Sequence, residues 1–195
     1  MKRIFLVGLV ISLIVLLAMA AACQEPLKLP EVPKSVSDKL ITIYDKFDDQ
    51  YTIAAYQTSK TGDETIQMIL IILYSQQGKK LYMGTTYVGS TWKWLEYSVI
   101  FVNDTRYETP HLEAMTETGC EMIEGGVREL IPLVYSDKDV AKIVNAIAAA
   151  DVDSIIEYRW YGDSGNIDGK FTKAEIEAWK VVFEYYNAID AKIWF

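Results

Sequence analysis

The sequence predicts an α+β fold, in which an antiparallel β-sheet meander of about five to seven strands packs one face against two helices in the C-terminal half. Segments rich in β-branched and aromatic residues follow one another from residue 51 onward and are separated by turn residues. Two stretches after residue 136 instead place apolar residues at helical spacing. Tyr, Trp and Phe make up 12% of the chain, which is typical of a packed domain and not of a disordered one.

The predicted strands end at clusters of turn residues. Residues 65–75 (TIQMILIILYS) are apolar on both faces, as a central strand covered on both sides is. Residues 127–135 form another strand with Pro132 near an edge, since proline cannot donate to a ladder. Residues 37–47 fit a helix or a strand, and residues 110–124 show no clear period. The other predicted strands are 51–58, 81–88, 92–102, 106–109 and 152–161, with turns at 59–63 and 76–79.

Two helices are predicted, each with a capping pattern before its apolar stripe. Residues 136–139 (SDKD) have the pattern of an N-cap, Ser136, with an acid three residues later, and this helix ends near Ala150. The last helix begins at Thr172. The predicted buried stripes are Val140, Ile143, Val144 and Ile147 in the first helix, and Ile176, Trp179, Phe183 and Tyr186 in the last.

The N-terminus has the pattern of an export signal. Two basic residues precede an uncharged apolar run from Ile4 to Ala22, which ends in three alanines directly before Cys23. This segment resembles a bacterial lipoprotein signal peptide, in which the cysteine thiol receives a diacylglycerol before cleavage. The family's motif is Leu-(Ala/Ser)-(Gly/Ala)-Cys, and Ala20 stands here at the leucine position. An uncleaved membrane anchor is the alternative, because the run has about the length of a minimal span of ~17–25 residues.

The lipoprotein resemblance implies a domain organisation and a location. Residues 1–22 would be the signal peptide, 23–37 the lipid anchor with a proline-rich spacer, and 38–195 a single domain. Acyl chains such as palmitate on Cys23 would make membrane lipid the expected partner. By the family's sorting rule, Gln24 in place of Asp favours the outer membrane of a Gram-negative cell, facing the periplasm or the exterior. In any other cell, the outer face of the cytoplasmic membrane is expected.

Composition narrows the class of partner. The formal net charge is −8, and removal of Lys2 and Arg3 makes the mature chain more acidic by two charges. An acidic surface argues against nucleic-acid binding through bulk electrostatics. The chain has two cysteines. With Cys23 acylated, no intramolecular disulfide is expected, and Cys120 is predicted to be a buried thiol that behaves as a small apolar residue.

Residues 164–175 resemble the twelve-residue calcium loop of EF-hand proteins. The resemblance implies calcium ligands at Ser164, Asn166, Asp168, Lys170 (through its backbone carbonyl), Thr172 and Glu175, with Gly169 at the sharp turn. Ser164 stands where that family has an aspartate. The alternative needs no metal: Asn166 and Asp168-Gly169 form a turn, and Thr172 with Glu175 forms a helix capping box.

A second candidate site is aromatic. Trp92 and Trp94 are two residues apart, so both project from one face if this segment is a strand. Such a pair suits a sugar ring or a peptide as ligand. The alternative is that the rings fill the space between the sheet and the helices.

Catalytic motifs are missing from the sequence. Its single histidine is His111, and it contains no Gly-x-Ser-x-Gly elbow, His-Glu-x-x-His pair or phosphate-binding loop. The expected function is therefore a non-enzymatic ligand-binding or cell-envelope interaction module. The alternatives are a calcium-stabilised domain that uses the loop at 164–175, and an envelope enzyme with an unrecognised carboxylate site.

Overall fold

The computed structural model describes residues 27–29, 38–55, 64–112 and 119–190. Within these ranges, the chain forms ten strands and two helices. The strands are β1 (Leu40–Asp45), β2 (Gln50–Ala55), β3 (Thr65–Ser75), β4 (Gly78–Gly89), β5 (Leu95–Val102), β6 (Thr105–Glu108), β7 (Gly119–Ile123), β8 (Gly126–Val134), β9 (Ile156–Gly162) and β10 (Ile167–Lys170); the helices are α3 (Lys138–Ala149) and α4 (Lys173–Ala188). The signal peptide, Cys23 and the turn predicted at 59–63 lie outside the described residues.

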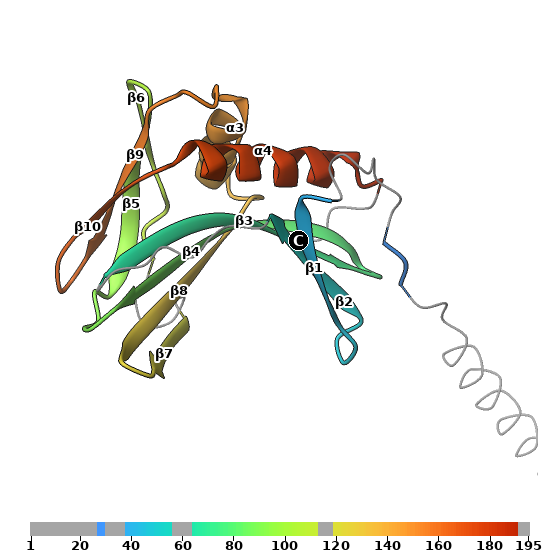
Figure 1. Ribbon diagram of the computed structural model, residues 1–195, viewed down its shortest axis with the longest axis horizontal. Helices are drawn as coiled ribbons and strands as arrows, with labels where there is room; N and C mark the ends of the chain where they lie inside the picture. The colour runs from blue at the N-terminus through green and yellow to red at the C-terminus, as the bar shows by residue number, and fades with distance from the viewer. Residues whose placement is uncertain (1–26, 30–37, 56–63, 113–118, 191–195) are drawn as a thin grey trace, which may run out of the picture.

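The strands form two antiparallel sheets, which confirms a β-rich α+β fold (Figure 1). One sheet has six strands in the order β1-β2-β3-β4-β8-β7, and the other has four in the order β10-β9-β5-β6. The prediction of one meander of five to seven strands is therefore wrong in number and connectivity. Although β5 follows β4 in the chain, it pairs with β6 and β9 and so begins the second sheet. Alternation along a strand does not encode this choice of partner.

The hydrophobic core is formed by the inner face of the six-stranded sheet, by α3 and α4, and by β5 and β9 of the four-stranded sheet. Predicted strand 65–75 matches β3 in full, and its alternate residues Ile66, Met68, Leu70 and Ile72 are buried in this core. The indole N–H of Trp179 in α4 donates to the carbonyl oxygen of Met68 at 3.1 Å, which ties the helix to the centre of the sheet. In Figure 1, α4 extends across this face. Helix α3 contacts α4 and also β5 and β6 of the four-stranded sheet.

Both helices begin at a side-chain cap, although the cap of α3 lies one residue later than the predicted Ser136. Asp137 is the N-cap of α3, and its side chain accepts from the backbone N–H of Asp139 and Val140. Thr172 and Glu175 form a complete capping box at the start of α4. The predicted stripe of α3 is buried at all four positions, and that of α4 is buried except at Phe183, which is half-buried.

Residues 37–47, which fit a helix or a strand, contain strand β1. Three other segments differ from the sequence pattern. Strand β5 begins at Leu95, so residues 92–94 are loop. Residues 110–124, which show no period, contain edge strand β7. Strand β10 lies where a turn or a calcium loop was expected.

The predicted edge position of Pro132 agrees with the register. Strand β7 pairs with β8 only as far as Leu130, so the following part of β8 needs no N–H on that side.

Candidate functional site

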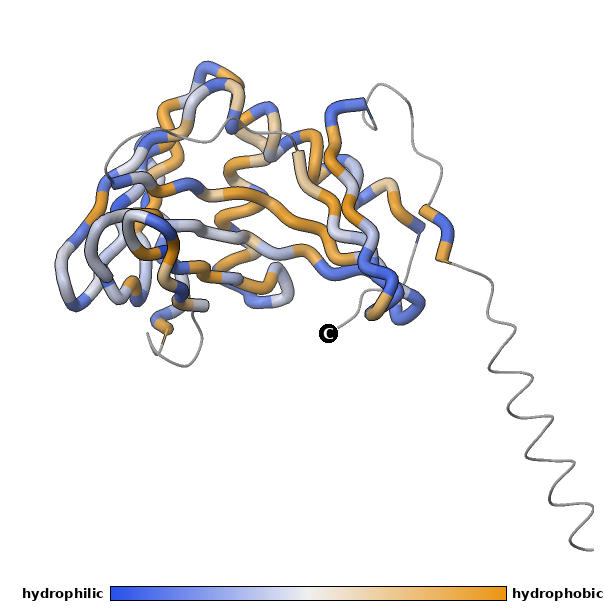
Figure 2. The backbone as a smooth tube through the Cα atoms, turned by 60° about the horizontal axis from the view of Figure 1, so that its bottom comes forward, coloured by the Kyte–Doolittle hydropathy of each residue, from blue (hydrophilic) through white to orange (hydrophobic). Residues whose placement is uncertain are grey.

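The most distinctive surface is the face of the six-stranded sheet that points away from α4, here called the outer face. Strand alternation and register place many apolar residues and glycines on it, among them Ile41, Ile43, Ala54, Ile69, Ile71, Leu73, Tyr82, Gly84, Leu130, Pro132 and Val134. The sheet is arched, with β1–β2 and β7–β8 bending away from α4, so this face is concave (Figure 1). Figure 2 turns it toward the viewer and shows long hydrophobic stretches along the central strands.

A groove of about 350 Å³ lies at the centre of the outer face. Its walls are Ile69, Ile71 and Leu73 of β3 together with Leu130 and Pro132 of β8. The β3 side chains are half-buried, and Leu130 is 40% exposed. A continuous apolar surface of this kind on a solvent-facing side of a sheet is characteristic of a binding site.

Gly84 keeps the floor of the groove low. It is paired with Ile69 on one side and with Pro132 on the other. A Cβ atom at position 84 would lie 3.1 Å from Cδ1 of Ile71, so the isoleucine side chain occupies the space that glycine leaves. The polar groups that line the groove are the hydroxyls of its threonines and of Tyr82, and none of the lining side chains is charged. The groove therefore suits a ligand segment that is uncharged and mainly apolar.

The sequence pattern of β3 already contained the signal for this face. Both the odd-numbered and the even-numbered residues of the strand are mostly apolar, which indicates two apolar faces. The sequence prediction takes both faces to be covered. In the part of the chain that the structure describes, α4 covers the inner face, whereas the outer face stays half-exposed. This was the feature that sequence reasoning missed.

The outer side of the four-stranded sheet carries both charged and apolar groups. A hollow of about 630 Å³ there is lined by Val99 and Phe101 as well as by ion-paired groups, and Arg159 binds both carboxylate oxygens of Asp168 at 2.6 and 2.8 Å. The Arg159 guanidinium holds the pKa of Asp168 below its usual range. Beside the hollow, the ring of Tyr97 stacks between Tyr161 at 4.7 Å and His111 at 3.9 Å. Because these charges pair with one another, they offer less to a charged ligand.

The predicted calcium ligands are distributed over a strand and a helix start. Asp168 is in β10 with its carboxylate on Arg159, and Lys170 lies in the same strand with its ammonium on Glu157. Thr172 and Glu175 bind each other's backbone N–H groups in the capping box. Ser164 and Asn166 lie in the exposed turn before β10. Among the described residues, no group of three or more His, Cys, Asp or Glu side chains is arranged to hold a metal ion.

Trp92 and Trp94 lie together, but not as neighbours on a strand. Their rings stack with centroids 5.2 Å apart in the loop between β4 and β5, and both are half-buried. Trp92 packs against the core, which agrees with the alternative that the rings fill the space between the sheet and the helices. Trp94 has a φ of 55°, a left-handed conformation that only a fixed loop retains in a bulky residue.

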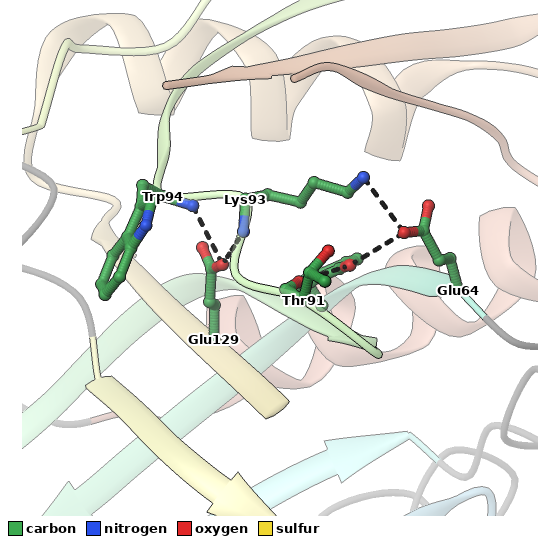
Figure 3. Close-up of polar contacts among 6 residues, drawn as sticks. Glu64, Thr91, Lys93, Trp94 and Glu129 are labelled. Carbon is green, nitrogen blue, oxygen red and sulfur yellow. Dashed lines mark hydrogen bonds and ion pairs between the residues drawn. The ribbon is translucent and has the colours of Figure 1, made fainter. Parts of the chain in front are cut away.

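A buried carboxylate fixes this loop (Figure 3). Glu129 of β8 is fully buried and accepts backbone N–H bonds from Lys93 at 2.6 Å, Trp94 at 3.0 Å and Leu95 at 2.9 Å. Lys93 extends its ammonium to Glu64 at 3.0 Å. The Tyr87 hydroxyl donates to the Thr91 carbonyl oxygen at 3.0 Å. Burial, followed by the charge of Glu64, raises the pKa of Tyr87 to about 12.

The remaining candidate groups form no catalytic set in the described residues. Cys120 is exposed on β7, so the prediction of a buried thiol is wrong; β7 is an edge strand and leaves that side chain uncovered. The His111 ring stacks on Tyr97, and its Nε2 atom lies 3.4 Å from a carboxylate oxygen of Glu108. Glu129 is held by three backbone donors and is shielded from solvent.

Comparisons with protein-family models, with curated proteins and with solved structures found no match for this chain. Within the ranges that the structure describes, no helix is both long and apolar enough to cross a bilayer.

Proposed function

We propose that the protein is an exported, lipid-anchored envelope module that binds an acyl chain in the apolar groove of its outer face, without catalysing a reaction. The observation that carries this proposal is the concave, half-exposed apolar face opposite α4. The lipoprotein-like signal at residues 1–22 and the lipidation expected at Cys23 supply the location.

The chemistry of the groove supports an acyl chain over a polar ligand. Small-molecule sites have volumes of about 300–1,000 Å³, and the groove of about 350 Å³ lies at the lower end of that range. Aliphatic side chains form its walls, and its polar groups are the uncharged hydroxyls of threonines and of Tyr82. Each methylene that leaves water for such a surface contributes roughly 0.8 kcal/mol. A few buried methylenes are enough for a selective but reversible complex.

The apolar surface continues from the groove to the edge of the sheet, which favours a lipid as the occupant. Ala54 of β2 follows Ile71 in register, and Ile41 of β1 follows Ala54. Ile41 is 42% exposed and Ile43 is 62% exposed. The buried residue Leu27, four positions after Cys23, lies beside this same hairpin. A lipid anchor at Cys23 would therefore bring this edge close to membrane lipid.

The alternatives have weaker support. A calcium-stabilised domain would require Asp168 to exchange the guanidinium of Arg159 for the metal. An enzyme with a carboxylate site would require a converging set of acids, and the carboxylate of Glu129 is already occupied by three backbone donors.

Photocrosslinking tests the proposal. The full chain is reconstituted in vesicles that contain a phosphatidylcholine with a diazirine in its acyl chain, irradiated, and the labelled peptides are identified by mass spectrometry. We expect label on the outer-face peptides of β3, β4 and β8. Leu130→Asp places a charge in the groove and should remove most of that label. Ile155→Asp is the matched control, because Ile155 is 56% exposed and does not line the groove.

Equal labelling in the two variants would contradict the proposal. Crosslinks between two copies of the protein through the same peptides, in place of lipid label, would show that a second chain covers the face instead.

A further inference from the structure

The N-terminal segment 27–29 belongs to the folded domain, although it falls within the predicted spacer. Leu27 is buried and Leu29 packs against the core. The Tyr51 hydroxyl donates to the carbonyl oxygen of Leu27 at 3.2 Å. Tyr51 is the second residue of β2 and faces Tyr44 in register, so Leu27 is fixed beside the turn of the β1–β2 hairpin. Figure 1 shows segment 27–29 and this hairpin at the same end of the molecule.

The distance from this fixed point to the predicted lipid is short. Cys23 precedes Leu27 by four residues. Four fully extended residues reach at most about 14 Å, at ~3.3–3.6 Å each. A lipid on Cys23 would therefore hold the hairpin within about two headgroup layers of the hydrocarbon core, since the two interfacial regions of a bilayer together add roughly 10–15 Å to that core.

The hairpin exposes an unusual share of apolar surface at this point. Eight large hydrophobic side chains are exposed in the described part of the chain, and four of them lie between residues 41 and 47. Phe47, in the turn, is 88% exposed. The turn that presents it is fixed, because Asp45 accepts the backbone N–H of Phe47 at 2.8 Å and Tyr44 donates its hydroxyl to Asp49 at 2.7 Å.

We infer that the turn of the β1–β2 hairpin inserts Phe47 into the interface of the membrane that holds the lipid of Cys23. The inference rests on the lipid anchor of the proposed function, but not on ligand binding in the groove. The aromatic ring enters the boundary between headgroups and acyl chains, and Lys46, whose ammonium lies 5.1 Å from the ring centre, stays at headgroup level. The turn also carries Asp45, Asp48 and Asp49. This excess of acids selects a zwitterionic surface over an anionic one.

Insertion would give the domain a fixed orientation. The lipid and the hairpin are two attachment points, and one acyl anchor alone leaves a domain free to rotate. Edge strand β1, on which the apolar outer face begins, would then be the side of the sheet nearest to the bilayer, with β7 at the far edge.

Site-specific fluorescence tests the inference on the full lipidated chain in phosphatidylcholine vesicles. Cys120→Ser removes the exposed thiol, and acylated Cys23 does not react with the label. An environment-sensitive fluorophore is attached at Phe47→Cys or, as the control, at Met122→Cys. Met122 is 85% exposed on β7, the opposite edge of the same sheet. We expect blue-shifted emission at position 47, quenched by lipids with a nitroxide in the acyl chain, and water-like emission at position 122.

The possible outcomes separate the inference from the anchor and from the groove. Water-like emission at both positions, with the protein in the vesicle fraction, overturns hairpin insertion while the anchor stands. Equal quenching at both positions overturns the fixed orientation. Loss of the protein from the vesicle fraction overturns the anchor and, with it, the inference. Groove binding is scored independently by the effect of Leu130→Asp on photocrosslinking.

Discussion

The carboxylate of Glu129 accepts the backbone N–H of Leu95 at 2.9 Å, and this bond joins the two sheets. Glu129 is in β8 of the six-stranded sheet, and Leu95 is the first residue of β5 in the four-stranded sheet. Two more N–H groups of the same loop bind the other carboxylate oxygen. Strand β4 ends six residues before β5 begins, and the chain passes from one sheet to the other in this short loop. The backbone N–H groups there have no strand partner, and the Glu129 carboxylate accepts their hydrogen bonds instead (Figure 3).

Removing the charge of Glu129 should destabilise the domain. In Glu129→Gln, the amide NH₂ faces a backbone donor, so at least one buried N–H loses its acceptor. Such a loss costs about 1–3 kcal/mol. Urea denaturation followed by circular dichroism measures the change in the free energy of unfolding.

Glu157→Gln is the control for this substitution. Glu157 is an exposed residue paired with Lys170, and exposed ion pairs contribute about 0–1 kcal/mol. Similar losses in both variants would show that Glu129 does not hold the loop.

The raised pKa of Tyr87 predicts an alkaline limit to stability. An unfolded tyrosine loses its proton near pH 10, whereas folded Tyr87 keeps it to about pH 12. Between these values the native state binds more protons, so the stabilisation that is complete below pH 10 is lost as pH rises. One proton accounts for a slope of at most about 1.4 kcal/mol per pH unit.

Tyr87→Phe should reduce this slope above pH 10 and cost about 1 kcal/mol at neutral pH, through loss of the hydrogen bond to Thr91. Urea denaturation at several pH values provides the readout. Tyr82→Phe removes a hydroxyl from the opposite face of the same strand and should leave the slope unchanged. An unchanged slope in Tyr87→Phe would assign the alkaline effect to other groups, such as Tyr158, whose pKa burial also raises.

Buried Lys79 closes the C-terminal end of α4. Its ammonium donates to the carbonyl oxygens of Tyr186 and Ile189, each at 2.7 Å, and lies 4.5 Å from the Tyr186 ring centre. Lys79→Met keeps the apolar stem but leaves two carbonyls without this donor, so we expect a loss of about 1–3 kcal/mol by thermal or urea denaturation. Lys80→Met, on the other face of β4, is the control and should change stability by less than about 0.5 kcal/mol.

The pH dependence of this contact has the opposite sign to that of Tyr87. Burial lowers the pKa of Lys79 below its usual value of 10.5. Between the lowered value and 10.5, the unfolded state binds more protons, so the free energy of unfolding contributed by Lys79 rises with pH. The wild-type protein should therefore lose less stability in that window than Lys79→Met. Parallel pH profiles for the two proteins would contradict this assignment.

Local patterns predicted the individual elements well. The limits of β3, the buried stripe of α3 and the capping box of Thr172 follow from residues close together in the chain. Apolar spacing and capping side chains act between residues that are a few positions apart. The limits and buried faces of these elements can therefore be predicted from the sequence alone.

Features set by distant contacts were not predictable in this way. The loop conformation of Trp94 depends on Glu129, which is 35 residues away. The second sheet depends on the pairing of β5 with β9. The apolar outer face depends on what lies over β3, and a strand with two apolar faces is equally consistent with two covering layers or with one layer and a ligand surface.

The segment at residues 164–175, which contains β10 and the start of α4, provides the clearest test between a metal site and a helix cap. Extracellular calcium sites have dissociation constants of about 10⁻⁴–10⁻³ M, so millimolar calcium would raise the melting temperature of a real site visibly. Because Arg159 occupies Asp168, and Thr172 with Glu175 forms the cap, we expect equal melting temperatures in EDTA and in millimolar calcium. Thr172→Ala should cost about 0.5–2 kcal/mol in both conditions. Asp168→Ala removes an exposed ion pair and should cost less. A calcium-dependent rise that Asp168→Ala and Glu175→Ala abolish would instead show that the loop exchanges its ion pair for a metal.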